Sequence, residues 1–357
     1  MRPKEAGKRE NGLNRCLALI PEFPASSAVS AHSAVMQSLQ MPDAPEISIT
    51  TPAAESPARN AAVVMVTFDR RDEVLCALDS IRTQSVSPRV VVLVNGSTDH
   101  TAEAVRERHP HVEVIDHPEA RPLLARRQEL LERVECEAMI ILDDDAVLTH
   151  PETLARSLAD LDHPRVGAVA IPVHERGGVR VPRGAADRPE AVARFLGAAA
   201  VLRRRACLDA GGWFVDLGMY YEEDDLCLKL LANGWFCRLG TAEPVEHNPS
   251  PSHRDSGDRI RRATASKLRF RWRHLRWSWL IHGLPTRLAW DAVYSLRHGC
   301  FRPVARGYAD AFKLILTRRT PRDPVPPDVQ RLWLRLRRHG PLPFDAMLHD
   351  GSAPVRP

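Results

Sequence analysis

The 357-residue sequence has no uninterrupted apolar stretch near the roughly 18 residues that a membrane-spanning helix needs, so an integral membrane protein is not expected. Its seven cysteines are odd in number and form no CxxC pair, which argues against a disulfide scaffold or a structural zinc site and favours a reducing cytosol. The first 35 residues start with basic side chains, but their apolar stretch, residues 16–20, ends at Pro21, so no secretory signal is expected. Together these absences predict a cytoplasmic globular protein.

The charge is unevenly spread along the chain. The formal net charge is +5, yet residues 259–306 hold twelve Arg or Lys and a single acid, Asp291, which gives this segment +11. The rest of the chain is therefore mildly acidic. A basic segment of this kind suits anionic lipid headgroups, nucleic acid or an anionic substrate.

The amino-acid composition and hydrophobic pattern of the sequence change near residue 60. Residues 1–58 are rich in Ala, Ser and Pro and are predicted to be a disordered tail, 59–255 an α/β domain, 256–340 a basic helical extension and 341–357 a C-terminal tail. Buried strands alternate with helices in the α/β domain, which favours a parallel sheet. The expected strands are 61–67, 89–94, 112–115, 138–142, 166–173, 197–202, 235–239 and 244–247; the expected helices are 72–83, 125–134 and 224–233. In the basic extension, helices are expected to break at 283–285 and 299–303.

Two acidic clusters stand out. Asp143, Asp144 and Asp145 directly follow the apolar strand 138–142, and ligands of open α/β sheets bind beyond the carboxyl ends of strands. Three adjacent carboxylates repel one another, and Mg²⁺ or Mn²⁺ bridging them to a diphosphate would relieve this repulsion. The alternative is a solvated acidic turn. The second cluster, residues 222–225, opens an expected helix, where acids are favoured by the helix dipole or can serve as a general base.

Five segments in order resemble glycosyltransferase family 2, the GT-A fold enzymes that use nucleotide-diphosphate sugars. They are VTFDR at 66–70, NGSTD at 95–99, ARR at 125–127, DDD at 143–145 and RRRACLDAGGWFVDLGMYYEEDDL at 203–226. The resemblance covers about residues 61–250. It implies a GT-A type, Rossmann-like, mostly parallel sheet with flanking helices, to which the basic α-helical extension is added.

The resemblance implies a donor site in the first half of this region. Thr67 is expected near the base, and Asp99, Arg126 and Arg127 near the nucleoside diphosphate. Asn95 belongs to the same substrate-binding set, although Asn95-Gly96 also reads as a plain tight turn. The sequence departs from the family at Val94, where the family has an Asp, so the identity of the nucleotide stays open.

By the same resemblance, Asp143 and Asp145 bind Mn²⁺ or Mg²⁺. Asp143 also contacts the donor, and Asp144 tunes the site as part of the substrate-binding set. His247, about twenty residues beyond the second cluster, completes the metal site in this interpretation, while a structural role for this lone histidine is equally expected. His253 and Arg254 are weaker candidates for phosphate contacts.

For the reaction itself, the family's catalytic Asp aligns with Glu223. Glu223 is therefore the expected general base, with Asp224 as the rival if the helix start shifts by one residue. Asp225 is expected to orient the loop beside the substrate. Trp213 could stack on a sugar ring, but packing in the core is at least as well supported.

The function implied is that of an inverting glycosyltransferase acting on a glycan or lipid-linked acceptor. Residues 267–281 interleave Arg with Phe and Trp, which suits the headgroup layer on the inner face of a membrane; the alternative is a helix packed on the domain with a solvated Arg face. Nucleic acid is not expected as a partner, because no recognisable module is present.

Two other functions are compatible with parts of the sequence. A sugar-phosphate nucleotidyltransferase is disfavoured because TFDRRD at 67–72 has no glycine with which to cradle a triphosphate. A catalytically inactive GT-A-like scaffold at the membrane surface remains the alternative, since Val94 and Glu223 both depart from the family pattern.

Overall fold

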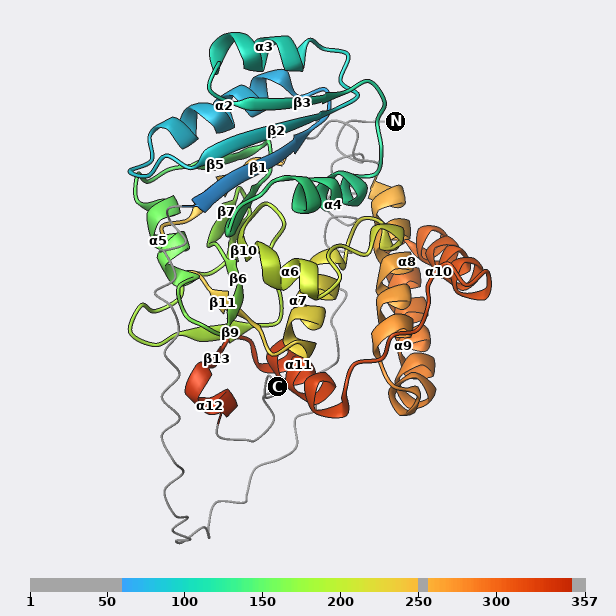
Figure 1. Ribbon diagram of the computed structural model, residues 1–357. Coiled ribbons are helices and arrows are strands. Elements are labelled where there is room, and N and C mark those ends of the chain that lie inside the picture. The colour runs from blue at the N-terminus through green and yellow to red at the C-terminus, as the bar shows by residue number, and fades with distance from the viewer. Residues whose placement is uncertain (1–59, 250–255, 349–357) are drawn as a thin grey trace, which may run out of the picture.

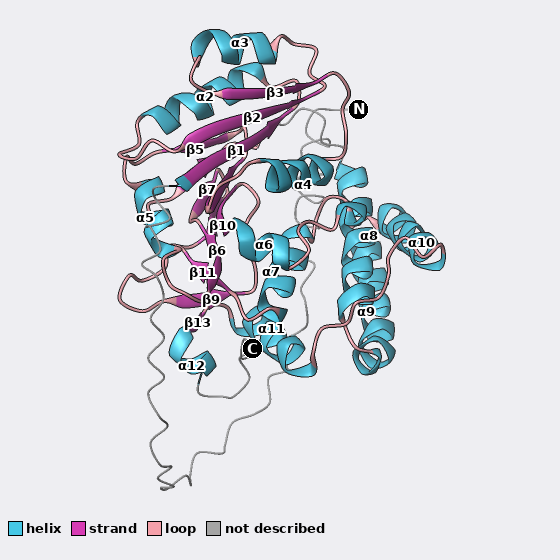
Figure 2. Ribbon diagram, viewed as in Figure 1, coloured by secondary structure: helices cyan, strands magenta, loops and turns pink. Residues whose placement is uncertain are grey.

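The computed structural model describes residues 60–249 and 256–348. The predicted tail at 1–58 and the phosphate candidates His253 and Arg254 lie outside these described residues. A nine-stranded sheet with helices on its flanks forms the body of the molecule, and a group of helices stands beside it (Figures 1 and 2). The α/β class with a helical C-terminal region is confirmed.

One half of the sheet is parallel, in the order β4-β1-β2-β3. β1, β2 and β4 are rich in apolar residues and almost wholly buried, as expected for strands covered on both faces, whereas the edge strand β3 is partly exposed. α2 and α3 lie together, and α4 packs on β1 and β2 (Figure 1). The bounds are β1 Ala61–Thr67, α2 Arg71–Arg82, β2 Arg89–Asn95, α3 Thr101–Arg108, β3 Glu113–His117, α4 Leu123–Arg133 and β4 Ala138–Leu142.

The other half of the sheet is mixed, which corrects the expectation of a mostly parallel sheet. β10 lies antiparallel between β4 and β6, while β11 runs parallel to β6, and β9 and β13 follow in antiparallel pairs. No helix lies between β6 and β10 in the sequence, so this connection provides no helical crossover of the kind that parallel pairing needs. The bounds are β6 Val166–Ala170, β9 Glu190–Val192, β10 Ala199–Arg203, β11 Phe236–Leu239 and β13 Leu342–Pro343.

A small second sheet lies beside the end of β4. Its order is β5-β12-β7-β8, with bounds β5 Ala146–Leu148, β7 Val173–Glu175, β8 Gly178–Val181 and β12 Val245–His247. The single strand expected at 166–173 is therefore two strands that belong to different sheets. In this register His247 pairs with Ala146, the residue after the Asp cluster, so segments a hundred residues apart meet at one point.

The remaining helices of the domain are α5 Thr153–Asp160, α6 Arg204–Asp209, the short 3₁₀ helix Val215–Leu217 and α7 Glu222–Ala232. The first turn of α7 is entirely acidic, and the leucines that follow are buried. Tyr220 and Tyr221, just before α7, both have left-handed φ values, of 73° and 66°, so the chain enters this helix through a strained turn.

The C-terminal region comprises α8 Ser256–His274, α9 Trp277–Arg297, α10 Phe301–Leu316, α11 Pro327–His339 and α12 Phe344–Leu348. The break expected at 283–285 is wrong, since α9 continues through Pro285; the Thr286 hydroxyl donates to the Gly283 carbonyl oxygen at 2.9 Å beside the proline. The break at 299–303 is found, shifted slightly, between α9 and α10.

The end of the chain returns to the central sheet. Val329, Leu332, Trp333 and Leu336 of α11 join the main hydrophobic core, and Leu342–Pro343 pairs with β9. The described part of the predicted C-terminal tail, up to residue 348, is therefore folded, because it covers the open edge of the sheet at β9. Within the two described ranges, no helix combines the length and the apolar composition that crossing a membrane requires.

Candidate active site

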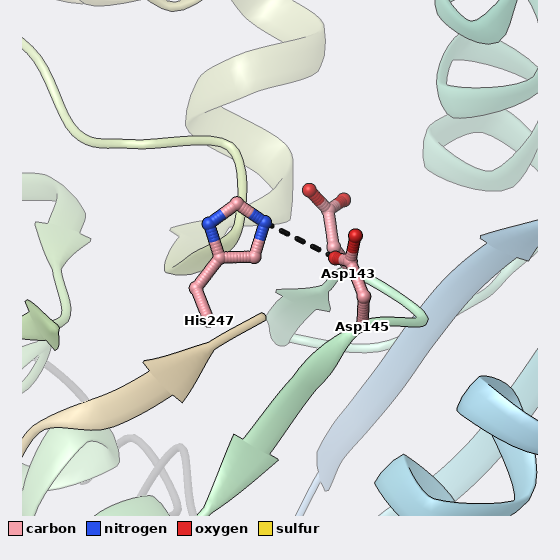
Figure 3. A group of neighbouring side chains, drawn as sticks. All are labelled: Asp143, Asp145 and His247. Atoms are coloured by element: carbon pink, nitrogen blue, oxygen red, sulfur yellow. Dashed lines mark ion pairs between the residues drawn. The ribbon is translucent and has the colours of Figure 1, made fainter. Parts of the chain in front are cut away.

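The first acidic cluster meets His247 at the end of β4. The ligand atoms of Asp143, Asp145 and His247 lie within 4.8 Å of one another, and His247 Nε2 is 3.1 Å from Asp145 Oδ1. Figure 3 shows the imidazole, carried by β12, facing the two carboxylates. The β12–β5 pairing produces this arrangement, and the Asn248 N–H adds a hydrogen bond to the Asp145 carbonyl oxygen at 2.9 Å.

Two arginines partly neutralise the three aspartates. Arg70 Nη1 lies 2.7 Å from Asp144 Oδ1 and 3.1 Å from Asp145 Oδ2, and Arg127 Nη2 lies 2.8 Å from Asp143 Oδ1. Burial nevertheless raises the pKa of Asp144 to about 6, although Arg70 opposes the shift. Burial raises the pKa of Asp143 in the same way, against the charge of Arg127. The cluster therefore still favours additional positive charge.

The chemistry of this donor set fits a divalent cation. Two carboxylates and one imidazole are ligands that Mn²⁺ accepts readily, while Mg²⁺ prefers oxygen ligands. Asp144 is turned to Arg70, so Asp143 and Asp145 are left as the carboxylates of the group that includes His247. These residues could hold the ion that the sequence predicted.

Glu175, which the sequence analysis missed, orients the histidine. It ends β7, the neighbour of β12, and its Oε1 lies 2.8 Å from His247 Nδ1. Burial acts to lower the pKa of His247, but the hydrogen bonds to Asp145 and Glu175 and the charges of Asp145 and Asp143 outweigh it and raise the pKa. A carboxylate on the far nitrogen of a metal-binding histidine fixes the tautomer that leaves Nε2 free for the metal.

Replacing Glu175 with glutamine is expected to weaken Mn²⁺ binding about 10- to 100-fold, because the imidazole loses the charge that orients it and raises its basicity. Calorimetric titration of the protein with Mn²⁺ measures this effect. Glu246→Gln is the matched control, since Glu246 lies next to His247 on β12 but faces His174 at the surface. Equal Mn²⁺ affinity in the Glu175→Gln variant and the wild type would contradict this role.

The residues predicted to bind the donor have different roles in the structure. Asn95 is buried and holds the loop between β3 and α4. Its amide donates to the Arg121 carbonyl oxygen and its Oδ1 accepts from the Arg121 N–H, both at 2.9 Å. Arg126 Nε also donates to Asn95 Oδ1, at 2.8 Å. Gly96 is required beside it, because a Cβ there would lie 2.4 Å from the Ala120 nitrogen. These contacts support the tight-turn interpretation of Asn95-Gly96.

Asp99 joins the loops that follow β1 and β2. Its carboxylate accepts hydrogen bonds from the backbone N–H groups of Arg71, at 3.0 Å, and Thr101, at 3.1 Å. Burial acts to raise the pKa of Asp99, but these bonds and the Thr101 hydroxyl lower it. Thr67, at the carboxyl end of β1, is buried, and within the described residues its hydroxyl has no hydrogen-bond partner. Of these two, Thr67 is the one that presents an uncommitted polar group.

A chain of contacts joins the two acidic clusters. Arg127 Nη2, which contacts Asp143, also donates to the Gly197 carbonyl oxygen at 3.0 Å, and the Gly197 N–H donates to Glu223 Oε1 at 3.0 Å. Glycine is needed between them, because a Cβ at residue 197 would lie 2.7 Å from Arg127 Nη1 and 2.8 Å from Glu223 Oε1. Segments 80 residues apart in the sequence therefore form one site.

The second cluster contains two kinds of carboxylate. Burial raises the pKa of Glu223, against the charges of Arg194 and Arg127, and burial together with the charge of Glu223 raises that of Glu222 still further above its ordinary value. Asp224 is fully buried, and its oxygens lie 3.1 Å from Arg194 Nη1 and 2.9 Å from Arg337 Nη1. Glu223 is the partly exposed member beside the Asp143 cluster.

Asp225 and Trp213 are part of the packed interior. Asp225 contacts Lys229 Nζ at 2.7 Å and His274 Nε2 at 2.6 Å; burial opposes ionisation, but these partners lower its pKa to about 2. It therefore ties α7 to α8. Trp213 is buried edge-on against Phe195, and its backbone N–H donates to Gln128 Oε1 at 2.7 Å. For Trp213 the core-packing alternative describes what is observed.

Part of the sequence matches a known protein family. Residues 62–216 match the family model of glycosyl transferase family 2. No curated protein matches this sequence. Among solved structures, GalNAc-T7 with UDP, GalNAc and Mn²⁺ is similar at 14% identity and a TM-score of 0.52; the match covers 73% of this chain and 58% of that one.

Two further solved structures are similar at lower TM-scores. The mannosyltransferase PcManGT from Pyrobaculum calidifontis, in complex with GDP-Man and Mn²⁺, has 21% identity and a TM-score of 0.47 over 75% of this chain and 82% of that one. S. aureus TarS, residues 1–349, has 16% identity and a TM-score of 0.45 over 60% and 72%. Residues 62–216 are therefore similar to glycosyl transferase family 2, and the fold is similar to that of GalNAc-T7.

Proposed function

We propose that the protein is an inverting glycosyltransferase that moves a sugar from a nucleotide-diphosphate sugar to an acceptor hydroxyl, with Glu223 as general base. The observation that carries the proposal is the contact chain from Asp143 through Arg127 and Gly197 to Glu223. It sets a candidate base beside a candidate diphosphate site, which a single displacement requires.

Asp143, Asp145 and His247 would hold Mn²⁺ or Mg²⁺, with Mn²⁺ favoured by the imidazole. When bound, such an ion offsets the negative charge that develops on a leaving diphosphate. Arg127 adds a fixed positive charge at the same point, and its guanidinium is held by Asp143 and the Gly197 carbonyl oxygen. Fixed charges of this kind stabilise a transition state without reorganisation.

The choice between Glu223 and Asp224 follows from their contacts. Asp224 is fully buried between two arginines, which suits a positioning role. Glu223 is partly exposed and accepts one hydrogen bond, from Gly197. Its raised pKa brings it nearer to neutral pH, where a carboxylate is a stronger base. Glu223 is therefore proposed as the base and Asp224 as a support for the start of α7.

The acceptor is proposed to be a glycan or a lipid-linked glycan, as the family resemblance suggested. No observed contact identifies the nucleotide of the donor. Val94 lies within β2 with its side chain buried, so it offers no carboxylate to a nucleotide base. The cytoplasmic location at the inner face of a membrane stays a prediction.

A donor screen tests the proposal. We expect release of nucleoside diphosphate from one member of a panel of UDP-, GDP- and dTDP-sugars, dependent on Mn²⁺ and abolished by EDTA. Calorimetry with each nucleoside diphosphate, with and without Mn²⁺, provides a readout that does not need the acceptor. Absence of both release and metal-dependent binding across the panel would favour the alternative of an inactive scaffold.

A further inference from the structure

The basic, Trp-containing segment at 267–281 is largely committed to internal packing. Lys267, Arg269 and Arg271 of α8 are buried, and Arg269 donates to the Thr320 hydroxyl at 2.7 Å and to the Leu217 carbonyl oxygen at 3.0 Å. Trp272 Nε1 donates to the Thr320 carbonyl oxygen at 3.1 Å. α8 thus holds the loop before α7 in place, and its cations are not a free surface.

Exposed apolar side chains lie instead on α10 and, spread around the helix, on α9 at Trp277, Ile281, Trp290, Val293 and Leu296. Phe301, Phe312 and Leu316 are exposed, Leu316 to 80%, and the spacing of 301, 305, 312 and 316 puts them with Ala305 on one side of the helix. The opposite side packs on α8: Gly307 approaches so closely that a Cβ would lie 2.5 Å from the Arg261 carbonyl oxygen. α10 lies at the outer edge of the helical group (Figure 1).

Cations line one edge of this apolar stripe. Arg302, Arg306 and Lys313 are exposed and lie beside the stripe at helical spacing, and none of them pairs with an acid within the described residues. Arg302 and Arg306 line a groove between α8 and α10 together with Arg261. Arg261 is neutralised by Asp258 and Asp310, so the uncompensated charge in this groove comes from α10.

We propose that α10 docks in the plane of an anionic lipid bilayer, with Phe301, Phe312 and Leu316 inserted among the headgroups and acyl chains. An exposed apolar stripe with a basic border is the pattern of an interfacial helix. The exposed cations of α10, Arg302, Arg306 and Lys313, complement negatively charged lipid. A second copy of the chain would meet this face with the same positive charge, and nucleic acid would leave the apolar stripe uncovered.

Docking through α10 also connects to the candidate active site. α8 is the helix on which α10 packs, and Ser266 of α8 donates to the carbonyl oxygens of Leu217, at 3.0 Å, and Met219, at 2.8 Å. These carbonyls belong to the loop that leads into Glu223. A membrane-bound α10 would therefore be linked to the proposed base through α8 and this loop. This part extends the proposed function.

Co-sedimentation with vesicles tests the docking face. We expect the full chain to bind phosphatidylcholine vesicles that contain phosphatidylglycerol and to bind pure phosphatidylcholine vesicles at least about tenfold more weakly. The double variant Phe312→Glu, Leu316→Glu should lose binding to both. The double variant Arg302→Ala, Arg306→Ala should lower binding to the anionic vesicles about tenfold or more, because each basic residue contributes to attraction by the surface.

Val179→Glu is the matched control, since Val179 is an equally exposed apolar residue on β8, and it should bind vesicles as the wild type does. Binding is measured without donor or metal, so this proposal and the proposed function can fail separately. Equal binding to both vesicle types, or wild-type binding by the double variant Phe312→Glu, Leu316→Glu, would overturn the proposal. If light scattering showed a dimer that the double variant Phe312→Glu, Leu316→Glu dissociates, the face would be assigned to a second copy instead.

Discussion

Asp145→Asn is expected to lower the metal-dependent rate about 10³-fold, which corresponds to about 4 kcal/mol of transition-state stabilisation. The substitution keeps the shape of the side chain and removes its charge. Asp145 is buried, lies 3.1 Å from His247 Nε2 and belongs to the only group of potential metal ligands found within the described residues. Without its charge, the remaining Asp143 and His247 would bind a divalent ion poorly.

The measurements are Mn²⁺ affinity by calorimetry and the rate of nucleoside diphosphate release at saturating Mn²⁺. Both should fall, and a high Mn²⁺ concentration should restore only part of the rate. Glu113→Gln is the control, because it removes a carboxylate at the start of β3, the opposite end of the parallel strands from the acidic cluster. Full activity of Asp145→Asn in EDTA would refute a metal role for this cluster.

The sequence predicted the parallel strands well, because their signal is local. β1 and β4 have the predicted bounds, since runs of buried β-branched and apolar residues end abruptly at polar turns. The Asp cluster was found for the same reason. The mixed half of the sheet and the second sheet could not be predicted as separate units, because their strands are two to five residues long and their pairing depends on distant partners.

The residues that the sequence missed act through tertiary contacts. Arg70 could have been proposed, because β1 and β4 are parallel neighbours and their carboxyl ends bring Arg70 next to the aspartates. Glu175 carries no such signal, since its place beside His247 depends on the β7–β12 pairing. The burial of Arg269 and Arg271 also could not be inferred, because alternating Arg and aromatic residues suit a packed helix and a membrane surface equally.

Glu223→Gln is expected to lower kcat for sugar transfer by about 10²- to 10⁴-fold, the usual contribution of a general base. Metal and nucleotide affinity should change little, because Gln can still accept the hydrogen bond from the Gly197 N–H. Acceptor-dependent transfer and the calorimetric titrations therefore respond differently. Loss of Mn²⁺ or nucleotide affinity equal to the loss in rate would assign Glu223 to donor binding.

The pH profile gives a second signature. A base must be ionised, and burial raises the pKa of Glu223 above its ordinary value of 4.5, so the wild-type rate should fall as the pH is lowered through that raised pKa. The Glu223→Gln variant should lack this acid limb. Asp224→Asn should retain the limb, with a lower free energy of unfolding, because Arg194 and Arg337 lose their buried partner.

The adjacent Glu222 provides the closest control for the base. Burial and the charge of Glu223 raise the pKa of Glu222 well above its ordinary value, which favours its neutral form. Glutamine is uncharged and similar in shape to a protonated glutamate, and Glu222→Gln should keep both the rate and the acid limb. If Glu222→Gln instead lost the limb and Glu223→Gln kept it, the proton of the acceptor would have to pass to Glu222.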